Sequence, residues 1–333
     1  LLMRPLFDQA RADKKRIVYA EGEDERVLRA AKAVIDEGVG IPILIGRPKI
    51  VQRRVERLGL NFKPGEDCEI INPQDDPRYR DYWKLYHSLA ERKGVSPDEA
   101  RTRVRTNTTV IAALALMRGD ADAMICGTEG RYDRHLQHVQ DVVGLRSDVQ
   151  DLSAVSVLIL SKGTIFITDT YVTPNPTVVE IAEMTHLAAE EVRRFGLVPK
   201  VALLSHSSFG SSNSASAQKM RAARKLVHER DPELQVEGEM HADAAIDPEI
   251  RERIFPSSVL EGQANLLVMP DQDAANIAFN LLKTLADGLA VGPILVGAKR
   301  SAHVLTPSVT ARGILNMSAV AAVGAQYDSR AKE

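Results

Sequence analysis

Short apolar runs alternate with amphipathic stretches through the first part of the chain. The runs at residues 16–20, 41–45, 68–71 and 121–126 are bounded by polar residues, which is typical of buried strands. After the first run, apolar residues recur at helical spacing, namely Val27, Leu28, Ala31, Val34 and Ile35. Strands that alternate with helices indicate a parallel sheet covered by helices.

The pattern changes after about residue 145, where two apolar runs follow each other directly. Residues 154–160 and 164–168 are joined by Ser-Lys-Gly, which predicts a hairpin that opens a second domain. Further strands are expected at three later runs, residues 200–205, 235–240 and 264–269. A final strand near residues 291–296 is expected to return the chain to the first domain.

This pattern predicts an α/β protein with two domains, each of three layers with a mainly parallel sheet. The first domain is expected to comprise residues 1–144 and 292–333, and residues 145–291 form a second domain inserted in it. A chain of 333 residues can bury a large core, and ordinary domain sizes favour two domains over one.

Composition excludes several classes of protein. The chain has 44% hydrophobic and 26% charged residues, as soluble globular proteins do, and a net charge of −2 argues against a broad nucleic-acid surface. The sequence has no run of about 18 apolar residues and no signal-peptide core, so we expect a cytoplasmic protein without a membrane segment. Cys68 and Cys126 lie in apolar runs and are expected to be buried thiols.

The stretch from Gly292 to Ile314 predicts strand, turn, strand and then the start of a helix. Thr306 is expected to cap this helix and Pro307 to occupy its first position. Ser308 and Thr310 add hydroxyl donors near the free amides of the first turn, which favours phosphate binding. The alternative is an ordinary capped helix that binds nothing.

Small hydroxyl-bearing residues also follow the run at residues 200–205. Ser207, Ser208, Gly210 and Ser211 form a turn before a helix, which is typical either of a phosphate cradle or of a plain connecting loop. Further polar residues are expected at the carboxyl ends of strands, where open α/β sheets place ligands, namely Arg131, Asp271 and Asn276.

Five segments together carry a resemblance that spans nearly the whole chain. They are residues 21–27, 204–211, 237–245, 270–277 and 292–314. The chain resembles the phosphate acetyl/butyryl-transferase family. The resemblance implies a phosphotransacetylase-like fold with an interdomain cleft, a homodimer or higher homo-oligomer, and an acyl-CoA ligand. Lys299, Arg312 and the serines above would then be available to the phosphates of the ligand.

The sequence departs from this family where the family places its chemistry. Active members usually read Pro-Val-Asn-Asp-Leu-Ser-Arg-Gly-Cys-Ser-Val-Glu-Asp-Ile, and the serine, the arginine and the last aspartate are assigned to catalysis. These positions fall on Thr306, Pro307 and Gly313, so the resemblance leaves no residue here as catalytic. A further family arginine falls on Gln137.

The altered pattern resembles a narrower group, the C-terminal domain of large bacterial NADP-dependent malic enzymes. Members of this group typically carry a run like His303-Val-Leu-Thr-Pro-Ser308 followed by Asn316-Met-Ser318. The resemblance implies a regulatory domain with acetyl-CoA as effector. It also implies a partner, an N-terminal malic-enzyme domain of the same polypeptide that is not within these residues and that carries the NADP and the divalent metal.

Other chemistries find little support in the sequence. It has no G-x-G-x-x-G fingerprint, and Ala298 replaces the lysine of a P-loop. His241, Asp243 and Asp247 have no specific metal spacing, so we expect neither a metal nor another cofactor in this domain. Three functions remain open: an acyl-CoA-binding regulatory domain of a malic enzyme, an active phosphate acetyltransferase, and a structural dimerisation module.

Overall fold

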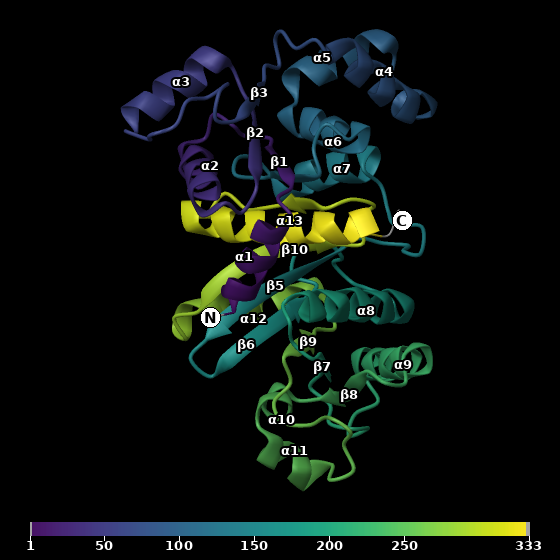
Figure 1. Cartoon of the computed structure of the whole chain (residues 1–333). Coiled ribbons are helices and arrows are strands. Elements are labelled where there is room, and N and C mark those ends of the chain that lie inside the picture. The colour runs from purple at the N-terminus through teal and green to yellow at the C-terminus, as the bar shows by residue number, and fades with distance from the viewer. Residues whose placement is uncertain (1, 331–333) are drawn as a thin grey trace. The chain divides into compact units, whose positions relative to one another are not determined.

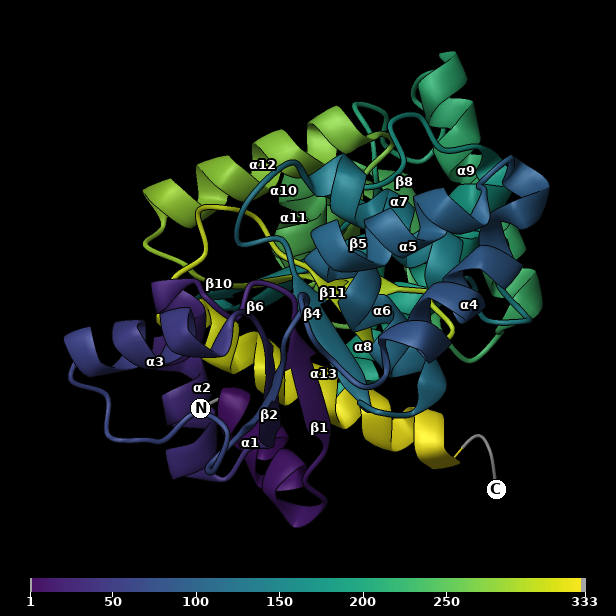
Figure 2. The same cartoon turned by 90° about the horizontal axis from the view of Figure 1, so that it is seen from above.

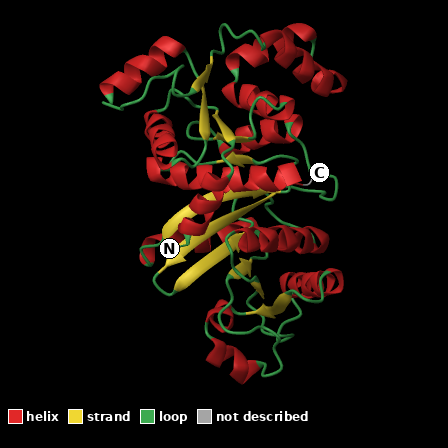
Figure 3. Cartoon of the chain, viewed as in Figure 1, coloured by secondary structure: helices red, strands yellow, loops and turns green. Residues whose placement is uncertain are grey.

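The alternation of strands and helices produces two α/β units in this computed structural model, which describes residues 2–330 (Figures 1 and 3). The first unit is formed by Met3–Ser147 and, among the described residues, by 298–330. The second unit is formed by Asp148–Gly297. The predicted fold class is thereby confirmed, since each unit has a sheet between layers of helices.

The first unit contains a five-stranded parallel sheet in the order β11-β4-β1-β2-β3. Its strands are β1 (Arg16–Tyr19), β2 (Ile41–Ile45), β3 (Glu69–Ile71), β4 (Ala123–Cys126) and β11 (Ala302–Val304). Its α-helices are α1 (Met3–Ala12), α2 (Glu25–Glu37), α3 (Pro48–Arg57), α4 (Tyr79–Ala90), α5 (Pro97–Thr106), α6 (Thr108–Arg118), α7 (Tyr132–Val142) and α13 (Ala311–Arg330). Helix α13 packs against β1 and β4 beside α1 and α2, as Figure 2 also shows.

Local sequence explains several of these elements. Asp24 caps α2 by accepting a hydrogen bond from the amide of Arg26, and Gly38 ends the helix in the left-handed conformation at φ 68°. Helix α6 is apolar on nearly all sides and is buried from Thr109 to Leu116, as expected for a helix inside the core.

Both cysteines are free and buried, as predicted.

The second unit contains a six-stranded mixed sheet in the order β10-β5-β6-β9-β7-β8. Its strands are β5 (Ser153–Leu160), β6 (Gly163–Thr168), β7 (Lys200–Leu204), β8 (Gln235–Met240), β9 (Leu266–Val268) and β10 (Leu289–Val296). Its helices are α8 (Val178–Arg194), α9 (Ala215–Arg230), α10 (Ala242–Ile246), α11 (Pro248–Ile254) and α12 (Gln272–Leu285). Strands β6, β9, β7 and β8 run parallel, whereas β5 forms the predicted hairpin with β6.

The expected return of the chain at residues 291–296 is wrong in detail. Strand β10 pairs antiparallel with β5, so it belongs to the second sheet, and the chain rejoins the first unit only after Gly297. The returning strand is β11, which pairs with β4. The apolar pattern marks both runs as buried but carries no information about which sheet each run joins.

Among residues 2–330, no helix is both long enough and apolar enough to cross a membrane.

Candidate functional site

Three loops leave the carboxyl edge of the first sheet from the neighbouring strands β1, β4 and β11. Arg26 joins all three. Its Nη1 atom donates to the carbonyl oxygens of Pro307 (2.6 Å) and Val309 (3.0 Å), and its Nη2 atom donates to the carbonyl oxygen of Thr128 (2.8 Å). The same guanidinium pairs with the carboxylate of Asp24 at 2.9 Å. One side chain therefore fixes the backbone of the site.

Glu21 binds two of these loops together from the end of β1. Its Oε1 atom accepts hydrogen bonds from the amides of Gly127 and Thr128, while its buried Oε2 atom has no hydrogen-bond partner within the described chain. Burial raises the pKa of Glu21 to about 7, although the backbone donors oppose the shift. Gly127, at φ 99°, is required here because any side chain would collide with the backbone of Leu305.

The 306–310 loop before α13 differs from the prediction. Helix α13 begins at Ala311, and Thr310 caps it by accepting a hydrogen bond from the amide of Gly313 at 3.0 Å. Thr306 and Pro307 instead begin a turn that closes from the amide of Val309 to the carbonyl oxygen of Thr306 at 3.1 Å. Pro307 suits the second position of such a turn as well as it suits a helix start, so the sequence signal was ambiguous.

Two features of this loop favour an anion. The hydroxyls of Thr306 and Ser308 lie 3.1 Å apart. Within the part of the chain that the structure describes, the amides of Ala311 and Arg312 take part in no hydrogen bond, so the first turn of α13 keeps free donors. The loop therefore presents hydroxyl and amide donors without a carboxylate or a cation of its own.

The structure does not gather the predicted charged residues around this loop. Arg131 pairs with Asp133 through two hydrogen bonds of 3.0 and 2.6 Å, and Arg312 lies 3.8 Å from a carboxylate oxygen of Glu37. Lys299 precedes β11, whereas Thr306 follows it, so the two residues lie at opposite edges of the sheet. The residue types were predictable from the sequence, but the directions of their side chains were not.

Gln137 lies on α7, where its amide donates to the carboxylate of Asp141 at 3.0 Å. It has no positive charge to offer a phosphate.

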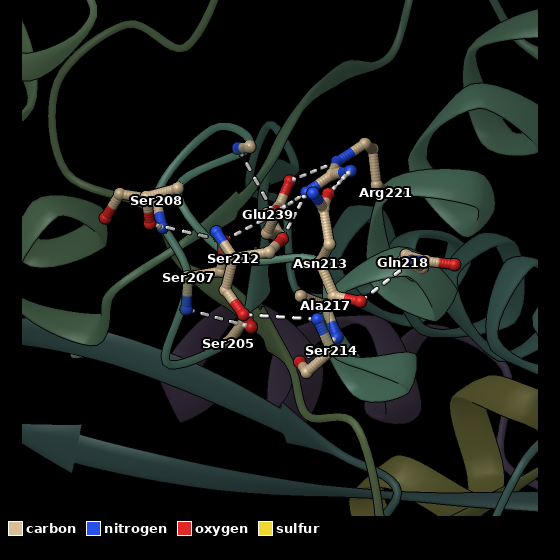
Figure 4. Close-up of polar contacts among 12 residues, drawn as sticks. Ser205, Ser207, Ser208, Ser212, Asn213, Ser214, Ala217, Gln218, Arg221 and Glu239 are labelled. Atoms are coloured by element: carbon tan, nitrogen blue, oxygen red, sulfur yellow. Dashed lines mark hydrogen bonds and ion pairs between the residues drawn. The ribbon is translucent and has the colours of Figure 1, made fainter.

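In the second unit, the residues between β7 and α9 form a compact serine loop (residues 205–214) around a buried carboxylate (Figure 4). Glu239 on β8 accepts hydrogen bonds from the Ser207 hydroxyl (2.7 Å) and the Gly210 amide (3.3 Å). Arg221 on α9 pairs with the same carboxylate at 2.7 Å. Burial opposes ionisation of Glu239, but the bonds from Arg221 and Ser207 hold its pKa below the ordinary value.

This carboxylate changes the interpretation of the serine loop. The amides of residues 207–212 all donate to partners within the loop or to Glu239, so the expected phosphate cradle is filled by the protein itself. The Ser207 and Ser211 hydroxyls lie 3.3 Å apart inside this network. The hydroxyl of Ser208 is buried without a hydrogen-bond partner in the described residues.

Asp271 and Asn276 have structural partners of their own. Asp271 caps α12 by accepting a hydrogen bond from the amide of Ala274 at 2.8 Å, and Asn276 donates to the carbonyl oxygen of Thr170 at 3.1 Å. Lys219 joins neighbouring loops by donating to the carbonyl oxygen of Pro270 at 2.6 Å and to Asn175 at 3.2 Å. These contacts position the carboxyl edge of the second sheet.

Sequence reasoning missed four residues that organise these sites, namely Glu21, Arg26, Arg221 and Glu239. Both acids lie in or directly after largely buried strands, where a carboxylate requires partners because burial of an unpaired charge is costly. A glutamate in or beside a predicted buried strand was therefore the available sign of a functional or structural role. It gives no indication of which distant cation or amide supplies the partner.

Within residues 2–330, no group of three or more His, Cys, Asp or Glu side chains has the arrangement of a metal site. His241, one of the residues considered for such a site, bonds through Nε2 to the carbonyl oxygen of His206 at 2.6 Å.

Comparisons with known proteins agree with this fold. The family model described as "Phosphate acetyl/butaryl transferase" matches residues 1–322. A phosphotransacetylase structure from Streptococcus pyogenes superposes with a TM-score of 0.89 at 28% identity, over 98% of each chain.

Relatives with a higher sequence identity than this phosphotransacetylase are named malic enzymes. The chain is 55% identical to an NAD-dependent malic enzyme of Rhizobium meliloti (strain 1021) and 49% identical to an NADP-dependent malic enzyme of Escherichia coli (strain K12). Each match covers 98% of this chain but only 42% and 43% of the respective relative. The chain thus spans less than half the length of these malic enzymes.

Proposed function

Because this chain belongs to the phosphate acetyl/butaryl transferase family, we propose that it binds acetyl-CoA or another acyl-CoA without transferring the acyl group. The similarity to part of several malic enzymes supports a regulatory role in such an enzyme, with the acyl-CoA as allosteric effector. NAD or NADP and a divalent metal would then belong to a separate malic-enzyme domain, which is a partner in the same polypeptide.

The proposed loss of acyl transfer rests on one observation, namely the identity of the side chains in and around the 306–310 loop. Transfer from acetyl phosphate to CoA requires a deprotonated thiol, and a free thiol with a pKa of about 8.5 is mostly protonated at neutral pH. The family resemblance assigns the base to the position of Gly313, which has no side chain. Loss of a positioned base costs about 10²–10⁴ in rate. Pro307, at the position of the family arginine, offers no donor to a phosphoryl group.

The geometry at Gly313 supports the proposed absence of a catalytic base. A Cβ atom at this position would lie 3.0 Å from Cγ2 of Val309, so a carboxylate would require Val309 to move. The loop nevertheless keeps the hydroxyls of Thr306 and Ser308 and the free amides of Ala311 and Arg312. Such donors favour a phosphate group, which supports binding without turnover.

The alternatives are distinguishable by experiment. An active acetyltransferase would release phosphate from acetyl phosphate when CoA is added. A structural module would assemble but bind no acyl-CoA. A role in assembly is compatible with the regulatory one, and we propose a homodimer in which apolar side chains of α12 contact a second copy. Ile277, Leu281 and Leu285 on that helix are 59%, 56% and 82% exposed.

The regulatory role is tested on a longer protein that joins this region to a malic-enzyme domain. We expect acetyl-CoA to inhibit malate turnover, since acetyl-CoA lies downstream of the pyruvate that the reaction supplies. A coupling of about 1–3 kcal/mol is typical of allosteric effectors, and it requires tighter binding to one assembly state. Ser308→Glu, which opposes a phosphate at the start of α13, should abolish the inhibition while turnover without acetyl-CoA stays unchanged.

The matched control is Ser216→Glu, because Ser216 is exposed on α9 and lies outside both proposed binding loops. If Ser308→Glu leaves the acetyl-CoA response intact, or if a protein that lacks this region responds identically, the regulatory assignment is wrong.

A further inference from the structure

A cavity of about 380 Å³ lies at the carboxyl ends of β1, β2 and β3 in the first unit. Its lining includes no residue of the 306–310 loop or of the serine loop. In the strand order β3-β2-β1-β4-β11, the chain changes direction across the sheet between β1 and β4. Open α/β sheets bind ligands outside the carboxyl ends of their strands at such a switch point. Glu129, in the loop after β4, also lines the cavity, so the position of the cavity makes it a candidate site.

The cavity is lined by both carboxylates and arginines, and two of the arginines have no carboxylate partner within the described residues. Arg105 lines it from the last turn of α5, and its guanidinium stacks 4.3 Å from the ring centroid of Tyr79. In the described residues, Arg105 has no carboxylate within ion-pair distance. Arg54 also lines the cavity and, within residues 2–330, donates one N–H, to the carbonyl oxygen of Glu23. Two guanidinium groups therefore retain donors for an anion.

The remaining cation of the cavity is already paired. Arg47 binds both carboxylate oxygens of Glu23, at 2.8 and 3.0 Å. Because Glu23 and Arg47 neutralise each other, neither contributes a net charge to the cavity. Asp24 is likewise neutralised by Arg26. Among the described residues, the charged groups of the lining that have no ion pair are thus Arg54, Arg105, Glu21 and Glu129.

Glu21 supplies an acceptor whose partner is missing. Its Oε1 atom is held by two backbone amides, but Oε2 is buried without a hydrogen-bond partner in the described chain. An unsatisfied buried acceptor is unfavourable by about 1–3 kcal/mol, so a donor supplied by a ligand would be stabilising there. When ionised, the Glu21 carboxylate repels a second anionic group placed beside it. A phosphate-rich ligand is therefore disfavoured at this end of the cavity.

We propose that this cavity binds a small hydroxy-carboxylate anion, with its carboxylate on Arg105 and Arg54 and its hydroxyl donating to Glu21. Ligand pockets commonly measure about 300–1,000 Å³, so the volume suits a small molecule. A guanidinium group matches the geometry of a carboxylate, and one buried acceptor distinguishes a hydroxylated anion from its unsubstituted analogue. This site stands without the acyl-CoA site, because the two involve different residues.

The test is calorimetric titration of the 333-residue chain with L-malate as the probe. Succinate, which lacks the hydroxyl, should bind at least about tenfold more weakly if the Glu21 contact forms. Arg105→Gln should weaken L-malate by about tenfold or more, as expected for loss of a charge-assisted pair. The matched control is Arg101→Gln, because Arg101 also stacks on an aromatic ring, 4.3 Å from Trp83, but does not line the cavity.

Acetyl-CoA binding should be unchanged in Arg105→Gln, which separates this site from the proposed function. Equal affinity for L-malate and succinate would overturn the role of Glu21. Equal effects of the Arg105 and Arg101 substitutions, or binding of glycerol 3-phosphate with no binding of L-malate, would overturn the proposal as a whole.

Discussion

Arg26 donates a 2.6 Å hydrogen bond from its Nη1 atom to the carbonyl oxygen of Pro307, which lies far along the chain in the 306–310 loop. The same guanidinium reaches Val309, Thr128 and Asp24. Proline has no N–H, so this turn is held through its carbonyl oxygens rather than through a donor at Pro307. The relationship makes the position of the proposed phosphate-binding loop depend on a residue at the start of α2.

Arg26→Gln is therefore expected to reduce both stability and acyl-CoA affinity. Hydrogen bonds to charged groups contribute about 1.5–3 kcal/mol, and the substitution removes several that share one guanidinium. Arg26→Lys should lose nearly as much, because an ammonium cannot reproduce the planar fork that spans three loops. Urea denaturation and acetyl-CoA titration measure the two effects. Full rescue by lysine would show that charge alone holds the loops.

Glu21 predicts a pH dependence of stability. Its pKa is about 7 in the folded chain against an ordinary value of 4.5, so the folded state binds more protons between these pH values. Stability contributed by this group is present at low pH and is lost as pH rises through about 7. Glu21→Gln should therefore stabilise the chain relative to wild type by about 1–3 kcal/mol at pH 8 and by much less at pH 5.

Urea denaturation at both pH values measures this difference. Glu25→Gln is the matched control, since Glu25 is exposed and pairs with Arg57. An equal effect of Glu21→Gln at pH 5 and pH 8 would contradict the raised pKa.

Much of the fold follows from the sequence because the buried strands are marked by short apolar runs. Strand β2 and strand β8 begin and end at the predicted residues. The same pattern could not assign β10 to its sheet, since pairing is decided by contacts between distant segments rather than by local hydrophobicity.

The candidate sites were less predictable. Residue types at Thr306, Ser308 and Ser208 indicate polar loops, and the structure places hydroxyls there. The partners Arg26 and Glu239 were not predictable, because each bonds to a segment far away in the sequence. The donors of a short hydroxyl-rich run can bond equally well to the phosphate of a ligand or to a carboxylate of the protein. In the serine loop they bond to the carboxylate of Glu239.

Ser207→Ala should destabilise the second unit through this internal carboxylate. The Ser207 hydroxyl donates to Glu239 and accepts from the amide of Ser212 at 3.0 Å, so the substitution leaves this amide without its acceptor and removes one donor from the Glu239 carboxylate. We expect a loss of about 1–3 kcal/mol, measured by urea denaturation. Ser216→Ala, on the exposed side of α9, should change stability by less than about 0.5 kcal/mol. Similar losses for both variants would contradict the role of the network.

Leu281→Asp should convert the proposed dimer into a monomer. Leu281 lies between Ile277 and Leu285 on one stripe of α12, and a carboxylate in an apolar interface is unfavourable because it loses its hydration. Sedimentation at micromolar concentration measures the assembly state. Val198→Asp, at another exposed apolar position, is the control. A chain that is monomeric without substitution, or a Leu281→Asp variant that remains dimeric, would remove α12 from the interface.

The central claim, acyl-CoA binding without acyl transfer, is tested most directly by titrating the chain with acetyl-CoA and measuring CoA-dependent phosphate release from acetyl phosphate in the same preparation. We predict saturable binding that Ser308→Glu weakens and Ser216→Glu does not, together with turnover far below about 1 s⁻¹, the low end of ordinary enzymes. Turnover above that rate, or no binding of acetyl-CoA, would contradict the account.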